Sequence, residues 1–169
     1  MKRMIIVSGP IGAGKTTYSI SLARDINAVR FSIDPWMQTL FADDMKSLDY
    51  AWMIERVYRC YEQIWDTCEK IFAIDGSVVL DLGFTEAKQR RLFADRAKSL
   101  GIEAEVHYLE VSKDVRKERV ARRNAEKDPE VYVFDVTDDM FNFMESRFEP
   151  PDDSEMKNGL RVGERTLPL

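Results

Sequence analysis

The sequence runs MIIVSGPIGAGKTT from Met4 to Thr17, an apolar run followed by closely spaced glycines and then Lys-Thr-Thr. The unbroken apolar run is typical of a central strand that is buried on both faces of a sheet. Residues 9–16 fit the pattern G-x-x-x-x-G-K-[ST], and they lie between this strand and a helix predicted from Lys15 to Asn27. The stretch therefore predicts a strand, a phosphate-binding loop and a helix in direct succession.

The glycine loop has the residue types that a triphosphate site needs. Glycines allow positive φ angles, so consecutive backbone N–H groups can turn toward one anion, and the following helix points its positive end at it. Lys15 can reach the outer phosphates, and the hydroxyl of Thr16 suits Mg²⁺. The predicted nucleotide-binding residues are Gly9, Gly12, Ala13, Gly14, Lys15, Thr16 and Thr17. The alternative is a tight strand-to-helix turn that binds nothing.

The rest of the chain alternates short strand-like runs with longer amphipathic ones, which favours an α/β fold with a mostly parallel sheet. Strands are predicted at 3–8, 29–34, 78–81 and 105–111, and 160–162 leaves a fifth strand open. Helices are predicted at 15–27, 48–72, 85–100, 112–127 and 138–148, with Thr85 and Ser112 as N-caps. Residues 1–169 are expected to form a single domain, because the chain is short for two.

Composition excludes several classes of function. The net charge of −5 disfavours non-specific nucleic-acid binding, and apolar runs are too short to cross a membrane. Cys60 and Cys68 lie about two helical turns apart on the predicted helix, roughly 12 Å, too far for a disulfide. Reduced thiols favour a cytoplasmic location.

Three further stretches accompany the glycine loop: FSIDPW from Phe31, VLDLGF from Val79 and ERVARRN from Glu118. Together they resemble small P-loop kinases of the AAA-family ATPase-like group, which are related to chloramphenicol phosphotransferase, zeta toxin and polynucleotide kinase. The resemblance covers residues 4–151. It implies a three-layer P-loop NTPase sandwich with strand order 2-3-1-4-5, with ATP and Mg²⁺ as cofactors.

Asp34 is predicted at the carboxyl end of the second strand, the edge where ligands gather in an open parallel sheet. Transfer of a phosphoryl group to an alcohol requires a carboxylate that takes the hydroxyl proton, and the resemblance implies this role for Asp34. Trp36 is expected to line the acceptor pocket beside it, within an acceptor-side helical segment at 35–73. The alternatives are a turn role for Asp34, which precedes a proline, and plain core packing for the aromatic residues.

Asp81 ends the third predicted strand, where a carboxylate can hold Mg²⁺ opposite Thr16. Its position resembles the Asp-Gly-Phe stretch of adenylate-type kinases, but Leu82 intervenes here. That departure leaves open whether Asp81 serves the metal, the acceptor or only a turn.

The helix after Ser112 is strongly basic, and Arg119, Arg122 and Arg123 can share one face of it. Guanidinium groups there can neutralise charge on a migrating phosphoryl group. The resemblance implies that Arg119 lies against the base, that Arg122 and Arg123 act on the phosphates, and that residues 113–135 form a lid. The alternative is a solvated helix surface paired with Glu118 and Glu126.

We therefore expect a phosphotransferase that moves the γ-phosphate of Mg-ATP to a hydroxyl or phosphate of a small molecule. A polynucleotide acceptor is less favoured because the chain is acidic, and no guanine-specific Asn-Lys-x-Asp motif is present. Two other functions stay open: a nucleotide-gated regulatory ATPase with no organic acceptor, and a nucleotide-binding module without turnover. The identity of the acceptor and the oligomeric state are left open by the sequence.

Overall fold

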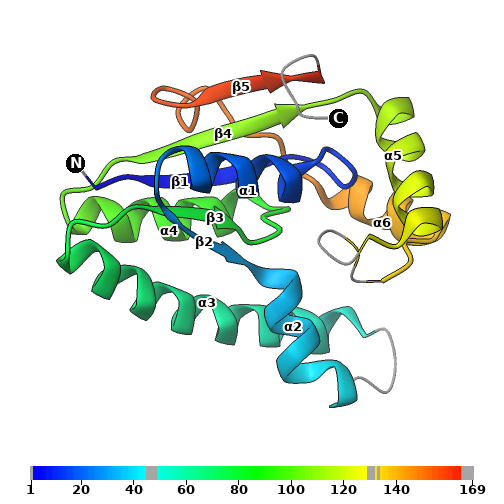
Figure 1. Cartoon of the computed structure of the whole chain (residues 1–169), viewed down its shortest axis with the longest axis horizontal. Helices are drawn as coiled ribbons and strands as arrows, with labels where there is room; N and C mark the ends of the chain where they lie inside the picture. The colour runs from blue at the N-terminus through cyan, green and yellow to red at the C-terminus, as the bar shows by residue number, and fades with distance from the viewer. Residues whose placement is uncertain (1, 45–48, 129–131, 133, 165–169) are drawn as a thin grey trace.

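The structure is a computed structural model that describes residues 2–44, 49–128, 132 and 134–164. Within these ranges five strands form one parallel sheet in the order β2-β3-β1-β4-β5 (Figure 1). The strands are β1 Met4–Ser8, β2 Val29–Ser32, β3 Val78–Asp81, β4 Ala104–Glu110 and β5 Leu160–Gly163. The predicted fold class and strand order are confirmed, and the fifth strand is present.

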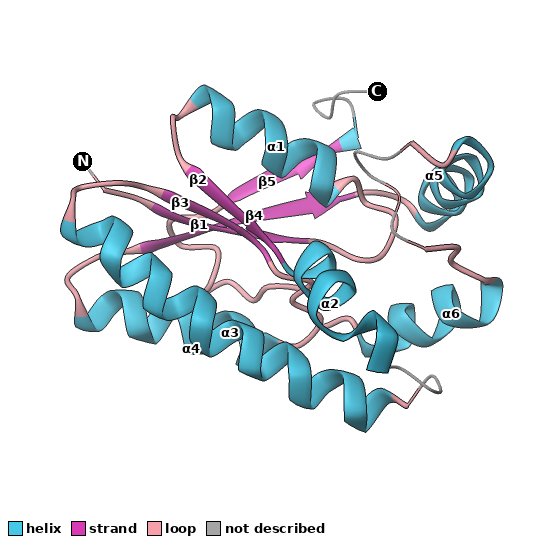
Figure 2. Cartoon of the chain, turned by 60° about the horizontal axis from the view of Figure 1, so that its bottom comes forward, coloured by secondary structure: helices cyan, strands magenta, loops and turns pink. Residues whose placement is uncertain are grey.

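Helices cover both faces of the sheet. Figure 2 shows α1, Lys15–Asp25, on one face, and α3, Tyr50–Ala73, with α4, Ala87–Ser99, on the other. The remaining helices, α2 Ile33–Phe41, α5 Lys113–Glu126 and α6 Asp138–Arg147, lie toward the end of the sheet to which the strand arrows point (Figures 1 and 2). A short 3₁₀ turn, Ala42–Asp44, follows α2. The fold thus gathers three helices near the carboxyl ends of the strands.

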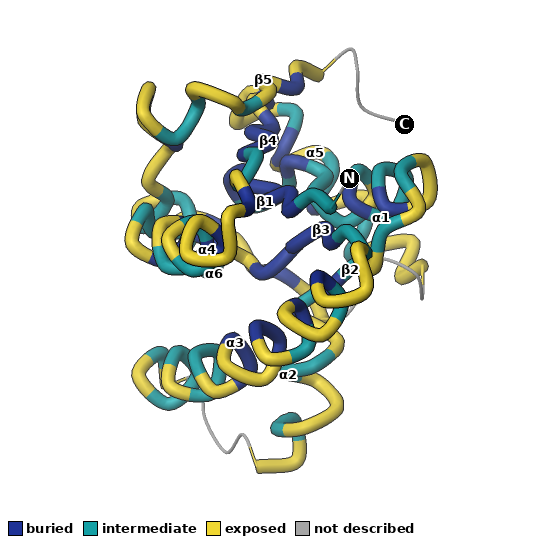
Figure 3. The backbone as a smooth tube through the Cα atoms, turned by 90° about the vertical axis from the view of Figure 1, so that its left-hand side faces the viewer, coloured by how far each residue is buried: buried dark blue, intermediate teal, exposed yellow. Residues whose placement is uncertain are grey.

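The core divides according to the alternation of side chains along the strands. Ile5 and Val7 of β1 pack on the α1 face, while Met4 and Ile6 pack on the α3 and α4 face, and all four are fully buried. Figure 3 shows the central strands β1, β3 and β4 largely buried, and helices whose outer sides are exposed. The apolar run at the start of the chain therefore forms the doubly buried central strand that its composition predicted.

The prediction that the second strand ends at Asp34 is wrong. β2 ends at Ser32, whose extended backbone makes it the N-cap of α2, and Asp34 lies in the first turn of that helix. An acidic side chain in the first turn is favoured by the helix dipole, and a proline such as Pro35 is tolerated there because first-turn N–H groups have no partner within the helix. Asp34 stays next to the sheet edge, but a helix positions it.

Other element boundaries shift by a few residues. Glu86 rather than Thr85 is the N-cap of α4, because the side chain of Gln89 accepts a hydrogen bond from the Glu86 backbone N–H at 3.0 Å. The long helix α3 begins at Tyr50 with Asp49 as its N-cap, and Leu48, where the sequence predicted its start, lies outside the described residues. Cys60 and Cys68 of α3 are buried free thiols. In the described part of the chain, no helix is long and apolar enough to cross a membrane.

Candidate active site

The glycine loop has a backbone that only glycine adopts easily. Gly12 and Gly14 have φ angles of 79° and 93°, and Gly14 is the N-cap of α1. A Cβ on Gly12 would lie 2.7 Å from the backbone oxygen of Arg116, so α5 packs directly on the loop. Ala13 between these glycines is fully buried, and Gly9 lies against Leu109 of β4. Gly12 and Gly14 therefore have the positive φ angles that a phosphate-binding loop of this pattern requires.

Lys15 turns back into this loop. Its Nζ donates hydrogen bonds to the backbone oxygens of Gly9, at 2.8 Å, and Pro10, at 3.0 Å. Burial lowers the pKa of the Lys15 ammonium, whereas the negative charges of Asp81 and Asp34 act to raise it. The predicted lysine and both predicted carboxylates are thus close enough to influence one another, at the junction of the loop and the sheet edge.

Asp34 is exposed to water but surrounded by charged groups from several elements. The pKa of Asp34 is raised, first by desolvation from the surrounding protein and then by the negative charge of Asp81, while Lys15, Arg123 and Arg30 act to lower it. Because the residue itself is exposed, water still reaches the carboxyl group and weakens the desolvation. A carboxyl group with a raised pKa that an incoming molecule can reach has the properties of a general base.

Asp81 makes contacts that the sequence analysis did not predict. Its Oδ2 accepts a hydrogen bond from Nη2 of Arg30 at 2.6 Å, and lies 3.1 Å from the hydroxyl of Ser19, which is fully buried on α1. Asp81 itself is 5% exposed. This carboxylate is therefore held at the third strand's end by groups from β2 and α1.

The three arginines predicted on α5 do not share one environment. Nη1 of Arg119 donates to the backbone oxygen of Ala13 at 3.1 Å, so this side chain lies over the glycine loop. Arg123 is close enough to Lys15 and Asp34 to act on the pKa of each, and its buried Nε has no hydrogen-bond partner among the residues that the structure describes. Arg122 is exposed, and no hydrogen bond joins its side chain to any residue that the structure describes. Arg119 and Arg123 face the site, and the role of Arg122 stays a prediction.

The side chains present fit a magnesium ion beside the loop. Within the described ranges the hydroxyl of Thr16 has no hydrogen-bond partner, and Oδ1 of Asp81 has none either, so both oxygens are available to a cation or its water ligands. Mg²⁺ prefers such hard oxygen donors, and it usually combines one or two carboxylates with substrate phosphates and water. No group of three or more His, Cys, Asp or Glu side chains in the described residues could hold a metal alone. Thr17 is exposed one position further along α1.

Trp36, which was predicted to line the acceptor pocket, is partly buried and packs against the core. Its ring meets Phe31 of β2 edge-on, with 6.5 Å between ring centroids, and it packs against the core of the α3 and α4 face. Further along the acceptor-side segment, Trp52 packs edge-on against Phe41 and lies under the guanidinium of Arg56, 3.7 Å from its ring centroid. Packing accounts for much of this aromatic cluster, and the acceptor role of Trp36 stays a prediction.

Arg116 holds the site together, although the sequence shows it only as one of several basic residues on the helix after Ser112. It is 4% exposed, and its guanidinium donates to the backbone oxygen of Ile11 in the glycine loop at 3.2 Å and to that of Val111 at 3.0 Å. Its Nη1 and Nη2 also form a bidentate pair with Glu145 of α6. Arg116 therefore ties the loop to the two helices beside it.

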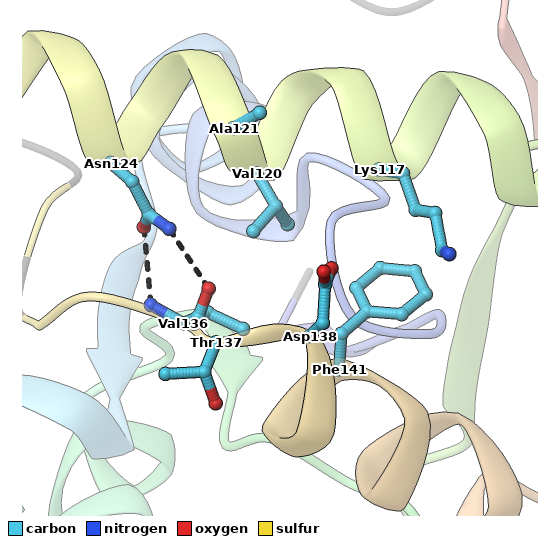
Figure 4. Close-up of a pocket in the computed structure, with 8 residues that line it drawn as sticks. All are labelled: Lys117, Val120, Ala121, Asn124, Val136, Thr137, Asp138 and Phe141. Atoms are coloured by element: carbon cyan, nitrogen blue, oxygen red, sulfur yellow. Dashed lines mark hydrogen bonds between the residues drawn. The ribbon is translucent and has the colours of Figure 1, made fainter.

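A separate cavity of about 250 Å³ lies between α5 and the segment that leads into α6 (Figure 4). The side-chain amide of Asn124 spans this region, donating to the backbone oxygen of Val136 at 2.8 Å and accepting from its N–H at 3.1 Å. The cavity is lined by Lys117, Val120, Ala121, Asn124, Val136, Thr137, Asp138 and Phe141. None of the predicted site residues belongs to this lining.

Comparisons with known proteins agree with this fold. Residues 4–151 match the AAA domain family. No curated protein matches the chain. A solved structure of a candidate kinase from Chloroflexus aurantiacus is 20% identical, with a TM-score of 0.70 over 96% of this chain and 85% of that one.

Two further solved structures are similar. Kti12 from Chaetomium thermophilum, in complex with ADP-AlF3, is 16% identical, with a TM-score of 0.70 over 95% of this chain and 89% of its own. The APS kinase CysC from Mycobacterium tuberculosis, in complex with AMPPNP and APS, is 15% identical, with a TM-score of 0.61 over 96% and 88%. The resemblance to small P-loop kinases is thus confirmed at the level of the fold.

Proposed function

Because this chain belongs to the AAA domain family, we propose that it is a P-loop kinase that transfers the γ-phosphate of ATP to a hydroxyl or phosphate group of a small molecule. The observation that supports this most strongly is the position of Asp34. It is a solvent-accessible carboxyl group with a raised pKa, and it shares one cluster with the loop lysine and Arg123. A nucleotide-binding module would not need such a base beside the loop.

The glycine loop binds the triphosphate in this proposal. The backbone N–H groups of residues 9–16 and the positive end of α1 hold the phosphates, and Lys15 leaves the carbonyl oxygens of Gly9 and Pro10 to contact the outer ones. Arg119, which lies over the loop, is assigned to the nucleotide, and Arg123, whose Nε has no hydrogen-bond partner among the described residues, is assigned to neutralise charge on the moving phosphoryl group. Arg122 is assigned to the same phosphates.

Asp34 acts on the acceptor. As the acceptor oxygen bonds to the γ-phosphorus, Asp34 accepts the hydroxyl proton, and the bond between that phosphorus and the β-phosphate oxygen breaks to release ADP. Trp36, two residues further along α2, is assigned to one wall of the acceptor site. Thr16 and Asp81 would hold Mg²⁺ or its water ligands, and the ion would offset the negative charge of the phosphates.

The domain organisation follows from these roles. We assign residues 113–135 to a lid over the nucleotide and residues 35–73 to the acceptor side, although residues 45–48, 129–131 and 133 lie outside the described ranges. A lid predicts that Mg-ATP protects the 113–135 segment from limited proteolysis. Cleavage there at the same rate with and without Mg-ATP would contradict it.

A screen of candidate hydroxyl compounds for ADP production tests the function. The proposal expects at least one class of small alcohol to raise ADP production well above the rate with water alone. The control is Asp34→Asn, which keeps the size of the side chain and is expected to keep nucleotide binding while losing the acceptor-dependent rate. ADP production that no acceptor changes would instead favour a regulatory ATPase.

A further inference from the structure

Arg30 occupies an unexpected place in the sheet. Along β2, Phe31 faces the core under α3 and α4, so Arg30 faces α1, where its neighbour in register on β3 is the buried Val79. The side chain of Arg30 is only 19% exposed. A long cationic side chain on a face otherwise packed with Ile5, Val7 and Val79 needs a partner, since an unpaired buried charge is costly.

That partner is Asp81, which follows Val79 by two residues and so lies on the same face of the sheet. Arg30 binds with two nitrogens: Nη2 donates to Oδ2 of Asp81 at 2.6 Å, and Nε donates to the hydroxyl of Ser19 at 2.7 Å. The three side chains come from β2, β3 and α1 and form one closed group.

Ser19 connects this group to the first turn of α1. Its hydroxyl accepts from Arg30 and lies 2.9 Å from the backbone oxygen of Thr16 and 3.1 Å from Oδ2 of Asp81, so its single proton is shared between two acceptors. Asp81 is therefore linked through Ser19 to the backbone of Thr16, in the first turn of α1. Only one of its oxygens is used, because Oδ1 makes no hydrogen bond to any described residue.

We propose that Arg30 is a positioning residue for the divalent cation, because together with Ser19 it fixes Oδ2 of Asp81 and leaves Oδ1 for the metal or its water ligands. The side chain of Arg30 forms hydrogen bonds to Ser19 and Asp81 and none to the glycine loop or to Lys15. Its effect on nucleotide binding therefore passes through Asp81. Partners that orient a metal-binding side chain commonly change metal affinity by about 10- to 100-fold when they are removed.

The test is a pair of calorimetric titrations with the nonhydrolysable nucleotide AMPPNP, one in EDTA and one in Mg²⁺, and the readout is the ratio of the two Kd values. For Arg30→Met we expect the affinity for AMPPNP in EDTA to stay within about twofold of the parent value. The factor by which Mg²⁺ increases that affinity should fall about 10-fold or more. Arg30→Lys keeps the positive charge but cannot contact Asp81 and Ser19 with two separate nitrogens. Compared with Arg30→Met, it should recover part of the Mg²⁺-dependent increase in affinity.

The matched control is Arg3→Met. Arg3 also pairs with a carboxylate through two nitrogens, at 2.8 Å to each oxygen of Glu105, but it precedes β1 at the opposite end of the sheet. The control should retain the parent ratio. An Arg30→Met protein with the parent ratio, an equal loss in EDTA and in Mg²⁺, or the same loss in Arg3→Met would each overturn the proposal.

Ser19→Ala provides a second variant in case Arg30→Met does not fold, because it removes only one oxygen atom from a fully buried position. It should also reduce the factor by which Mg²⁺ increases the affinity for AMPPNP, and an unchanged ratio of the two Kd values would count against the proposal. The inference rests on the proposed function only for binding of Mg-ATP. A parent that binds no AMPPNP contradicts the proposed function, whereas a parent that binds it while the variants keep the parent ratio contradicts the role of Arg30 alone.

Discussion

Arg116 of α5 and Glu145 of α6 form a bidentate ion pair, with Nη1–Oε2 and Nη2–Oε1 distances of 2.6 and 2.7 Å. The same guanidinium donates to the backbone oxygen of Ile11 at the tip of the glycine loop. Planar guanidinium and carboxylate groups that meet in this way fix distance and orientation together. The pair therefore fixes α6 to the loop that is proposed to bind the phosphates.

Replacing Glu145 by Gln should lower the free energy of unfolding by about 1–3 kcal/mol at neutral pH, because hydrogen bonds to a charged group are lost. The hydrogen bonds from Arg116 lower the pKa of Glu145, so this stabilisation is present above the unfolded-state pKa and is lost as the pH falls through the folded-state value. Urea unfolding of parent and variant at neutral and acidic pH measures this.

The control is Asp66→Asn, which removes an exposed ion pair with Lys70 and should change stability by less than about 0.5 kcal/mol. A difference between parent and Glu145→Gln that stays constant down to acidic pH would show that the ionised carboxylate is not the source of the stability.

Gly12→Ala tests the backbone of the loop. The φ of 79° disfavours any Cβ, and here the Cβ would also lie 2.7 Å from the backbone oxygen of Arg116. Gly101 offers a matched comparison, since it has a φ of 71° with nothing within 4 Å of a Cβ. We expect Gly101→Ala to cost about 1–2 kcal/mol from backbone strain alone, and Gly12→Ala to cost more and to weaken AMPPNP binding. Equal losses in the two variants would mean that α5 does not constrain the loop.

Lys15→Met should weaken nucleotide binding by roughly 10- to 100-fold, the equivalent of losing a charge-assisted contact of about 1.5–3 kcal/mol. Lys98→Met, on the exposed face of α4, is the control and should bind as the parent does. Calorimetric titration with AMPPNP measures both. Parent-like affinity in Lys15→Met would remove this lysine from the phosphate site.

The pH dependence of phosphoryl transfer should follow the ionisation of the Asp34 carboxyl group. The base must be ionised to accept a proton, and the pKa of Asp34 is raised, so activity should be lost on acidification at a pH above the ordinary carboxyl pKa of about 3.9. Asp81 is one cause of that rise, and Asp81→Asn should therefore move the acid limb of the kcat/KM profile of the residual activity to lower pH. A limb that stays in place or moves to higher pH would exclude the coupling between the two carboxyl groups.

Much of the fold was predictable because several of its strands and helices are determined by patterns of neighbouring residues in the sequence. The apolar run before Gly9 and the pattern up to Thr16 predict the central strand, the loop and the start of α1, and the structure confirms all three elements. The strand order came from the resemblance to a family rather than from periodicity. By contrast, the boundary between β2 and α2 was predicted wrongly, because the alternation of the apolar residues Val29, Phe31 and Ile33 continues past Ser32, where β2 ends.

The contacts that hold the site together were not predictable, because they join residues distant in the sequence. Arg30 and Asp81 are 51 residues apart, and Arg116 lies 105 residues from the loop oxygen that it binds. In the sequence, Arg30 is marked only as a polar residue between the apolar Val29 and Phe31. Helical spacing likewise grouped Arg119, Arg122 and Arg123, but it could not predict that Arg119 binds the backbone of Ala13 or that Arg123 lies close to Lys15 and Asp34.

In the proposed reaction the terminal phosphoryl group of ATP passes to an acceptor oxygen beside Asp34. The most direct measurement uses ATP labelled in its γ-phosphate and follows the label after incubation with the alcohols that stimulate ADP production. We expect labelled phosphate ester with the parent, and a rate of ester formation lower by about 100-fold or more with Asp34→Asn at unchanged nucleotide affinity. Label that appears only as inorganic phosphate, or ester formed at the parent rate by Asp34→Asn, would contradict it.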